Sequence, residues 1–140
     1  MRVDPNNPVV QLCVKGLEAE ARGEREVALN LYLQAWDARR DVYDACIASH
    51  YVARLQITPA SSLHWNQESL NAANLVNDER VAQFYPSLYL NLGKAYEDLG
   101  NVADARRNYE FAESRLHVLA DDKYAEIVKR GISAALARVG

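Results

Sequence analysis

The chain has 140 residues, of which 49% are hydrophobic and 25% are charged, a composition typical of a soluble globular protein that is long enough to bury a core. Its formal net charge of −3 and isoelectric point near 5.6 argue against binding to nucleic acid or an anionic membrane, because such proteins present a basic face. No apolar run reaches the roughly 18 residues that span a membrane, and the start MRVDPNNPVV lacks the apolar segment of a secretion signal. Together with two isolated cysteines, this predicts a cytoplasmic protein with free thiols.

Apolar residues recur at helical spacing along nearly the whole chain, and patterns typical of strands are almost absent. Gly23 and Gly100 suit the left-handed position that follows a helix, and Asn101 suits the start of the next one. Thr58 and Pro59 together are typical of the first two positions of a helix. We therefore expect an all-α fold of antiparallel neighbours, with seven helices at about residues 8–21, 24–39, 42–55, 59–77, 86–99, 102–118 and 121–138.

The first predicted helix pair reappears in the third pair at one constant offset in residue number. The matched residues are Gly16 and Gly93, Gly23 and Gly100, Ala28 and Ala105, Tyr32 and Tyr109, and Ala35 and Ala112. This offset is somewhat longer than two helix-pair periods of about 34 residues each, and the long helix predicted at 59–77 has room for the excess. The sequence therefore predicts repeated helix pairs, with a degenerate copy between two clearer ones in which His50 takes the place of the glycine.

The third pair resembles the tetratricopeptide repeat (TPR), whose pattern is W-x2-L-G-x2-Y followed by A-x3-F. The residues at matching positions are Tyr89, Leu92, Gly93 and Tyr96, followed by Ala105, Tyr109 and Ala112. The resemblance implies one TPR-like domain over residues 1–140, of the small bacterial type. Its repeats would span about 9–42, 43–85 and 86–119, and a C-terminal capping helix would span about 121–138.

The resemblance also implies an antiparallel helix-pair solenoid, in which the glycine of a first helix meets a small residue of the second where the two cross. The residues expected at these crossings are Gly16, Ala28, Tyr32, Gly93, Tyr96, Ala105, Tyr109 and Ala112. An interior glycine costs roughly 1 kcal/mol relative to alanine, so close packing between helices must offset that cost. Gly93→Leu or Ala105→Leu is therefore expected to destabilise the domain by about 1–3 kcal/mol or more.

Proteins of the TPR family mostly bind an extended peptide or a partner helix on a concave surface formed by the first helix of each pair. On that surface the resemblance places Leu17, Asp44, Ile47, Tyr51, Arg54, Leu90, Asn91, Lys94 and Glu97 as candidate partner contacts. Tyr51 is the expected apolar anchor, and Arg54 and Lys94 are the expected charged contacts. We therefore expect a non-catalytic scaffold that binds a protein or peptide partner.

The identity of that partner is not set by the sequence, but one class is disfavoured. TPR domains that hold chaperone C-terminal tails use lysine, asparagine and arginine as a carboxylate clamp. The corresponding positions here carry Cys13, Leu17, Ala48, Ser87 and Asn91, so the basic residues are missing and a chaperone tail is not expected.

Two alternatives to a peptide-binding scaffold remain open at this point. The chain could self-associate as a homodimeric structural module, because its last predicted helix has apolar residues at Ile127, Ile132, Leu136 and Val139. It could also be an accessory subunit, or a fragment, of a larger enzyme or regulatory complex.

Catalytic and metal-binding chemistry has little support in the residue pattern. Cys46 and His50 share a helical face and could form half of a zinc site, but no second pair has suitable spacing, and His64 and His117 are isolated. Cys13 and Cys46 lie on neighbouring first helices, where we expect packed thiols rather than a redox pair. No phosphate-binding loop or nucleophile motif is present. We therefore expect no catalytic residue, no metal and no cofactor.

Overall fold

The computed structural model describes residues 4–140, and within this range all regular secondary structure is helical. The elements are α1 (Pro8–Ala21), α2 (Arg25–Asp37), α3 (Val42–Arg54), α4 (Pro59–Val76), α5 (Glu79–Ala82), α6 (Tyr85–Asp98), α7 (Val102–Ser114), the 3₁₀ helix η1 (Leu116–Val118) and α8 (Lys123–Val139). The prediction of an all-α fold is confirmed. The predicted number of seven helices is wrong, because the described residues form eight α-helices.

The two differences from the predicted helices lie in connections, one between α4 and α6 and the other between α7 and α8. α5 has four residues, which is too short for an apolar period to register, and it starts where Asp78 accepts a hydrogen bond from the backbone N–H of Arg80. The helix predicted at 102–118 ends instead at Ser114 and continues as η1, so that the chain turns toward α8.

The predicted helix ends follow from identifiable caps. Gly23 and Gly100 have φ of 76° and 83°, a left-handed conformation in which a residue with a Cβ is strained, so both predictions are confirmed. Thr58 accepts a hydrogen bond from Ser61 N at 3.1 Å, and Asn101 accepts one from Asp104 N at 3.3 Å. α4 therefore starts at Pro59 and runs for 18 residues, as the long middle helix of the sequence requires.

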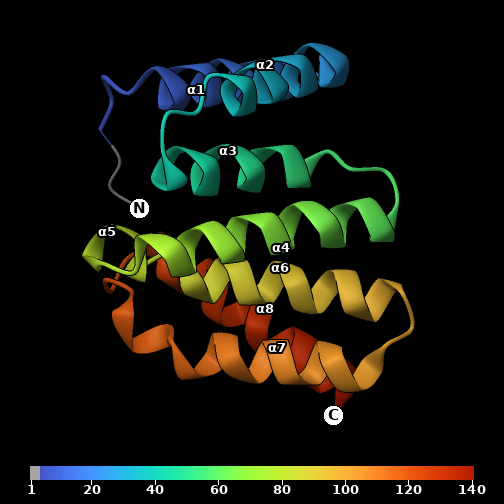
Figure 1. Ribbon diagram of the computed structural model, residues 1–140. Helices are drawn as coiled ribbons and strands as arrows, with labels where there is room; N and C mark the ends of the chain where they lie inside the picture. The colour runs from blue at the N-terminus through green and yellow to red at the C-terminus, as the bar shows by residue number, and fades with distance from the viewer. Residues whose placement is uncertain (1–3) are drawn as a thin grey trace.

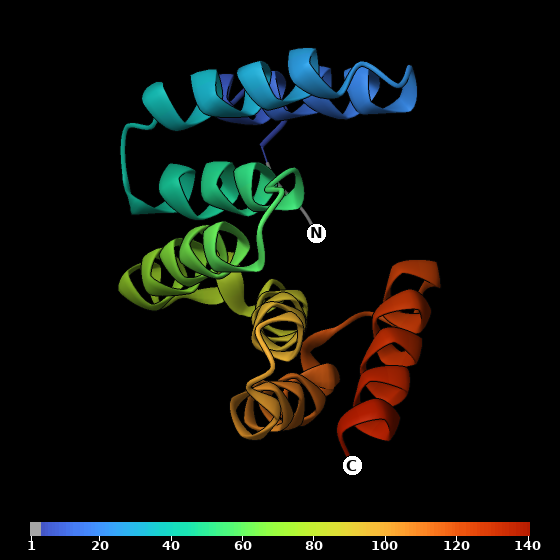
Figure 2. The ribbon, with the colours of Figure 1, turned by 90° about the vertical axis from the view of Figure 1, so that its right-hand side faces the viewer.

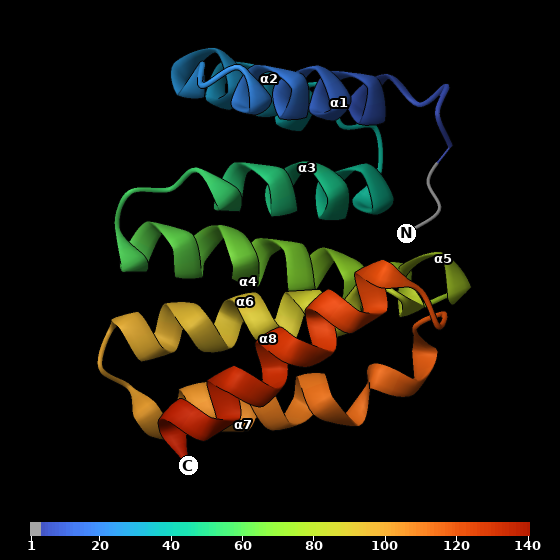
Figure 3. The ribbon, with the colours of Figure 1, turned by 180° about the vertical axis from the view of Figure 1, so that it is seen from behind.

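The helices pack mainly in sequential pairs, because the most extensive contacts join α1 to α2, α3 to α4 and α6 to α7. Figure 1 shows these helices as a row of layers, in which α2 also contacts α3 and α4 contacts α6. In Figure 2, α1 and α2 are seen along their length while α6 and α7 are seen nearly end-on, so the helix axes rotate along the row. α8 crosses α6 and α7 obliquely (Figure 3).

The apolar core follows this row. One large cluster of buried side chains extends from Val9 in α1 to Leu92 in α6, and two smaller clusters join α6 and α7 to α8. Tyr32, Tyr109, Leu88 and Leu92 are among the largest fully buried side chains. The described part of the chain contains no helix that is long and apolar enough to cross a membrane.

Candidate functional site

In two of the helix pairs, a glycine of the first helix faces a tyrosine ring of the second. A Cβ on Gly16 would lie 2.7 Å from Cδ1 of Tyr32, and a Cβ on Gly93 would lie 2.5 Å from Cδ1 of Tyr109. Real Cβ atoms do not come this close, and both rings are fully buried. Each glycine therefore makes room for an aromatic ring of the second helix.

Both tyrosine hydroxyls donate a hydrogen bond to a glutamate that lies one helical turn after the glycine. Tyr109 donates to Glu97 at 2.7 Å, and Arg138 of α8 binds the same carboxylate through contacts of 2.9 and 3.1 Å. In the first pair, Tyr32 donates to Glu20, and Arg54 of α3 binds Glu20 through two contacts of 3.3 Å. The glycine, glutamate and tyrosine of the two constellations are related by the same sequence offset as the two helix pairs.

The charge of each glutamate is stabilised by these donors. Hydrogen bonds from Arg138 and then from Tyr109 lower the pKa of Glu97 to about 2. Burial alone would raise the pKa of Glu20, but hydrogen bonds from Tyr32 and Arg54 outweigh it and lower that pKa below its ordinary value. Both carboxylates are thus structural ion-pair partners, ionised near neutral pH.

A second arginine contact also occurs in both places, this time from the second helix of each pair. Arg25 of α2 donates to the carbonyl oxygen of Leu55 at the end of α3, and Arg106 of α7 donates through Nε to the carbonyl oxygen of Val139 at 3.0 Å. α8 is therefore fastened to the α6–α7 pair by the same two kinds of bond that fasten α3 to the α1–α2 pair.

The middle pair, α3–α4, has a different constellation at the equivalent positions. His50 follows Gly16 at the same sequence separation at which Asn66 follows Tyr32. The exposed fraction of Asn66 is 3%, and its Nδ2 donates to Ser62 O at 2.9 Å and to Ser62 Oγ at 3.2 Å. Its Oδ1 and the Nδ1 of His50 are buried without a partner in the protein. Burial is the main cause that lowers the pKa of His50 to about 4, with a smaller contribution from Arg54.

His50 and Asn66 line a pocket of about 210 Å³ between α3, α4 and α6, which we call the polar pocket. Its other lining residues are Ala53, Arg54, Ser62, Asn91 and Lys94. The two cations in this set already have partners, because Arg54 binds Glu20 and the Nζ of Lys94 lies 2.7 Å from an oxygen of Asp98. The pocket therefore offers hydrogen-bonding groups, with no cation that is free of an intramolecular ion pair.

A second pocket of about 120 Å³ is also lined by His50 and is mainly apolar; we call it the apolar pocket. Its lining comes from α1, α3 and α4 and from the start of α6, and consists of Val10, Cys13, Val14, Cys46, Ile47, His50, Tyr51, Ser69, Phe84, Ser87 and Leu88. Val14 is 47% exposed, which places it at the solvent edge. The ring of Tyr51 packs against that of Tyr32 in a tilted arrangement, with centroids 5.3 Å apart, so it is held by the preceding pair.

Five of the nine predicted partner contacts line these pockets. Ile47 and Tyr51 line the apolar pocket, and Arg54, Asn91 and Lys94 line the polar pocket. The sequence reasoning missed Asn66, although Asn66 lies as far along the chain from Tyr32 as His50 lies from Gly16.

The other four predicted contacts lie elsewhere. Leu17 is half-buried on α1 and lines neither pocket, and Leu90 packs against α8, where a Cβ on Gly131 would lie 3.2 Å from its Cδ2. Glu97 is held by Tyr109 and Arg138. Asp44 has an exposed fraction of 0%, so it is removed from any contact surface by burial.

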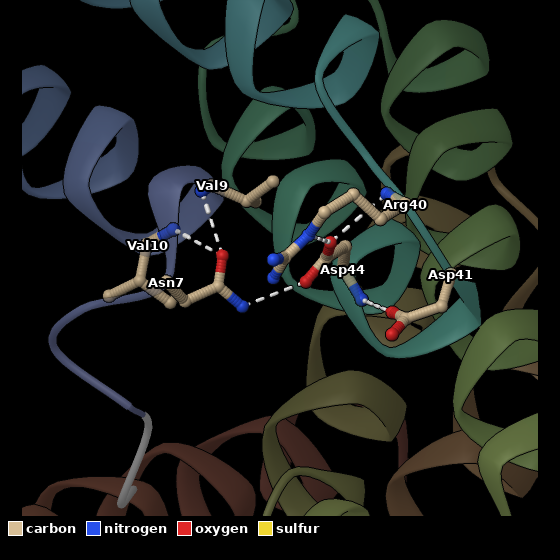
Figure 4. A network of polar contacts seen from close by, with 6 residues as sticks. All are labelled: Asn7, Val9, Val10, Arg40, Asp41 and Asp44. Atoms are coloured by element: carbon tan, nitrogen blue, oxygen red, sulfur yellow. Dashed lines mark hydrogen bonds and ion pairs between the residues drawn. The ribbon is translucent and has the colours of Figure 1, made fainter.

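Asp44 instead joins three segments of the chain (Figure 4). Its Oδ1 accepts a hydrogen bond of 2.8 Å from Nδ2 of Asn7, whose own Oδ1 caps α1 through Val9 N at 2.8 Å. Its Oδ2 accepts from the backbone N and from Nε of Arg40, each at 3.0 Å. Although burial opposes it, these bonds lower the pKa of Asp44. The network fixes the start of α1 against the start of α3.

The cysteines are packed groups of the same region. Burial raises the pKa of Cys13 to about 12 and that of Cys46 to about 11, so both thiols are protonated near neutral pH. Cys46 Sγ lies 3.7 Å from Ser69 Oγ, and the Ser69 hydroxyl donates to Cys46 O at 2.8 Å. Residues 4–140 contain no group of three or more histidine, cysteine or acidic side chains placed to hold a metal ion.

The apolar residues of the last helix are mostly used inside the molecule. Ile132 and Val139 are 1% and 5% exposed, and Leu136 packs against buried residues of α7 and α8. Of the four residues considered for self-association, Ile127 is exposed, at 61%. α8 therefore covers α6 and α7 rather than presenting an apolar stripe.

Comparisons of the chain with protein-family models, with curated proteins and with solved structures found no match. The interpretation of the two pockets consequently depends on their own geometry and chemistry.

Proposed function

We propose that this protein is a non-catalytic scaffold of three TPR-like helix pairs and a final helix, and that it binds an extended peptide segment of a partner protein across the two pockets. The observation that carries this proposal is the junction at His50. An apolar pocket and a polar pocket adjoin there, and most of their lining comes from α1, α3 and α6, the first helices of the three pairs.

The repeated constellation supports the assignment of helix pairs. Gly16, Glu20 and Tyr32 recur as Gly93, Glu97 and Tyr109, and an arginine of the next packed helix binds each glutamate. A recurrence in both sequence offset and contacts is typical of stacked repeats, in which each pair contacts its neighbours. The middle pair has His50 and Asn66 where the other two pairs have a glycine packed against a tyrosine ring, and these two residues line a pocket.

The chemistry of the lining favours recognition over reaction. The two cysteine thiols are protonated, and the nearby glutamates are held in ion pairs, so these groups are not poised as nucleophiles or bases. A pocket of about 120 Å³ suits one apolar side chain of a peptide, and the neighbouring polar groups can fix its register.

A random peptide library displayed on phage and selected on the immobilised full chain tests the proposal. Selected peptides are synthesised, and their dissociation constants are measured by fluorescence anisotropy for the wild type and for Val14→Lys, which places a charge at the edge of the apolar pocket. We expect Val14→Lys to weaken binding at least about tenfold, because a charged group in an apolar contact is costly to desolvate.

Val27→Lys is the matched control. Val27 is 45% exposed, close to the 47% of Val14, but it lies on α2 and lines neither pocket. Peptide affinity within about twofold of wild type is expected for it, since surface changes away from a contact have small effects. Equal losses for the two variants, or no selected peptide at all, would contradict the proposal. Light scattering on the same samples separates a monomer of 15.7 kDa from the alternative of a self-associating module.

A further inference from the structure

The orientation of the Asn66 side chain in the polar pocket is fixed by its neighbour. Its Nδ2 lies 2.9 Å from the carbonyl oxygen of Ser62, which can only accept a hydrogen bond. Rotation of the amide by half a turn would bring two oxygens together, so Oδ1 must be the atom left over. This acceptor is buried and has no partner in the protein, a state that ordinarily costs about 1–3 kcal/mol.

The Nδ1 atom of His50 adds a second unpartnered group to the same pocket. It is a donor in one neutral tautomer and an acceptor in the other. On the α6 side lie Asn91, whose amide can donate or accept, and Lys94, whose ammonium group only donates and already contacts Asp98. A ligand that satisfies the pocket must therefore donate to Asn66, and one that can also accept is able to pair with His50 as a donor or with Lys94.

Few functional groups do both in so small a space. A carboxylate has no hydrogen to donate to Asn66, and its charge would face the Oδ1 dipole. An ammonium group has no acceptor for Lys94 and would place a second positive charge beside it. A primary carboxamide has two N–H donors and a carbonyl oxygen, so it can meet Asn66 and either tautomer of His50 while accepting from α6.

We propose that the polar pocket binds a primary carboxamide, the side-chain group of asparagine or glutamine in the partner peptide. This inference rests on the proposed function, since it names the side chain that enters beside the apolar pocket. The pocket of about 210 Å³ has room for such a group. Recognition is then by hydrogen bonding to a neutral amide, and the adjoining apolar pocket takes a neighbouring apolar side chain of the same segment.

Three small probes of similar size test the chemistry without a known partner. They are propionamide, propionate and N-methylpropionamide, which stand for a primary carboxamide, a carboxylate and a main-chain amide. Each is titrated into the uniformly ¹⁵N-labelled full chain while two-dimensional NMR follows the side-chain amide of Asn66 and the backbone amides at 50, 66 and 91. We expect propionamide to shift these signals with a dissociation constant at least about fivefold lower than those of the other two, because propionate has no hydrogen to donate to Asn66 and N-methylpropionamide has a single N–H for Asn66 and His50 together.

Variants separate the site from general weak association. Asn66→Leu and the half-buried Asn91→Leu are expected to remove most of the preference for propionamide. Asn71→Leu is the control, because Asn71 is an exposed residue of the same helix. Should Asn66→Leu fail to fold, Asn91→Leu and the comparison of probes on the wild type still decide the question.

Several results would overturn the inference. They are equal responses to the three probes, shifts confined to residues outside the pocket, and no shift at concentrations of about 100 mM, the last of which would mean that water alone satisfies Asn66. The phage selection is independent of this test. Selected peptides that contain no asparagine or glutamine but still lose affinity for Val14→Lys would support peptide binding at the apolar pocket and contradict carboxamide binding in the polar pocket. Specific binding of propionamide without any selected peptide would support the carboxamide site and contradict peptide binding.

Discussion

Gly93 and Tyr109 form a matched pair, in which the aromatic ring of Tyr109 on α7 occupies the space that a side chain at position 93 of α6 would need. A Cβ on Gly93 would lie 2.5 Å from Cδ1 of Tyr109, and the ring is fully buried with its hydroxyl bound to Glu97. The ring therefore cannot move aside without breaking that hydrogen bond. The same relationship between Gly16 and Tyr32 fixes the first helix pair.

Gly93→Ala should consequently be destabilising, although alanine is the better helix former by roughly 1 kcal/mol. We expect the free energy of unfolding in urea to fall by about 1–3 kcal/mol, as is typical when a close-packed interior is overfilled. Gly131→Ala in α8 is the matched control, because its Cβ would meet only the flexible end of Leu90, at 3.2 Å. Equal changes in the two variants would show that helix propensity, not the tyrosine ring, controls the response.

The pKa of Glu97 predicts a loss of stability in acid. It is about 2 in the folded protein, against 4.5 in an ordinary glutamate, so the unfolded chain binds the proton more readily. The stabilisation from Arg138 and Tyr109 is complete above pH 4.5 and is lost as the pH falls from 4.5 toward 2. Glu97→Gln should be less stable than wild type at pH 7, and the difference should shrink over that range.

Urea unfolding followed by circular dichroism at several pH values measures this difference. Glu110→Gln, an exposed change on α7, should keep the wild-type dependence on pH. A Glu97→Gln variant whose stability runs parallel to that of wild type down to pH 2 would be inconsistent with a carboxylate stabilised by Arg138.

The buried carboxylate of Asp44 leads to a third prediction. Asp44→Ala removes the acceptor for Asn7 Nδ2 and for two N–H groups of Arg40. We expect a loss of about 2–4 kcal/mol in the free energy of unfolding, because a buried donor is left unpaired and charge-assisted bonds are broken. Asp37→Ala, an exposed aspartate at the end of α2, should change stability by no more than about 0.5 kcal/mol.

A double-mutant cycle with Asn7→Ala shows whether the effect passes through the network. The two changes should be clearly less than additive, since both break the bond between Asn7 and Asp44. Additive losses would mean that each residue acts only within its own helix.

The sequence predicts most of the local structure of this molecule, such as the ends of its helices. It predicts little of what depends on burial and on contacts between distant segments. Gly23, Gly100 and Thr58 mark helix ends through short-range backbone chemistry, and the structure has all three where expected. The repeat register implied by the TPR resemblance places Tyr51 and Lys94 among the partner contacts, and each of these residues lines a pocket.

Contacts between distant segments account for the residues that lie elsewhere. The repeat register places Asp44 and Glu97 among the partner contacts. In the structure, however, the carboxylate of Asp44 binds Asn7 and that of Glu97 binds Arg138, so both are occupied by contacts within the molecule. Leu90 is covered by α8, and no local sequence pattern predicts that α8 crosses α6 obliquely. Asn66 escapes sequence reasoning because a small polar residue at the position of Tyr32 shows its importance only when its buried oxygen is found without a partner.

The low pKa of His50 gives a pH dependence in a window that lies mostly above that of Glu97. Burial, aided by the charge of Arg54, lowers this pKa from 6.5 to about 4, so between these values the unfolded chain binds a proton that the folded protein does not. Stability should therefore fall as the pH is lowered from 6.5 to 4. In His50→Gln this part of the decline should be absent, because glutamine does not titrate, whatever the stability of the variant at pH 7. His64→Gln, at an exposed position on α4, should keep the wild-type decline. Urea unfolding at pH 7, 6, 5 and 4.5 measures the slope, and the same slope in His50→Gln and wild type would show that the imidazole of His50 is solvated in the folded protein.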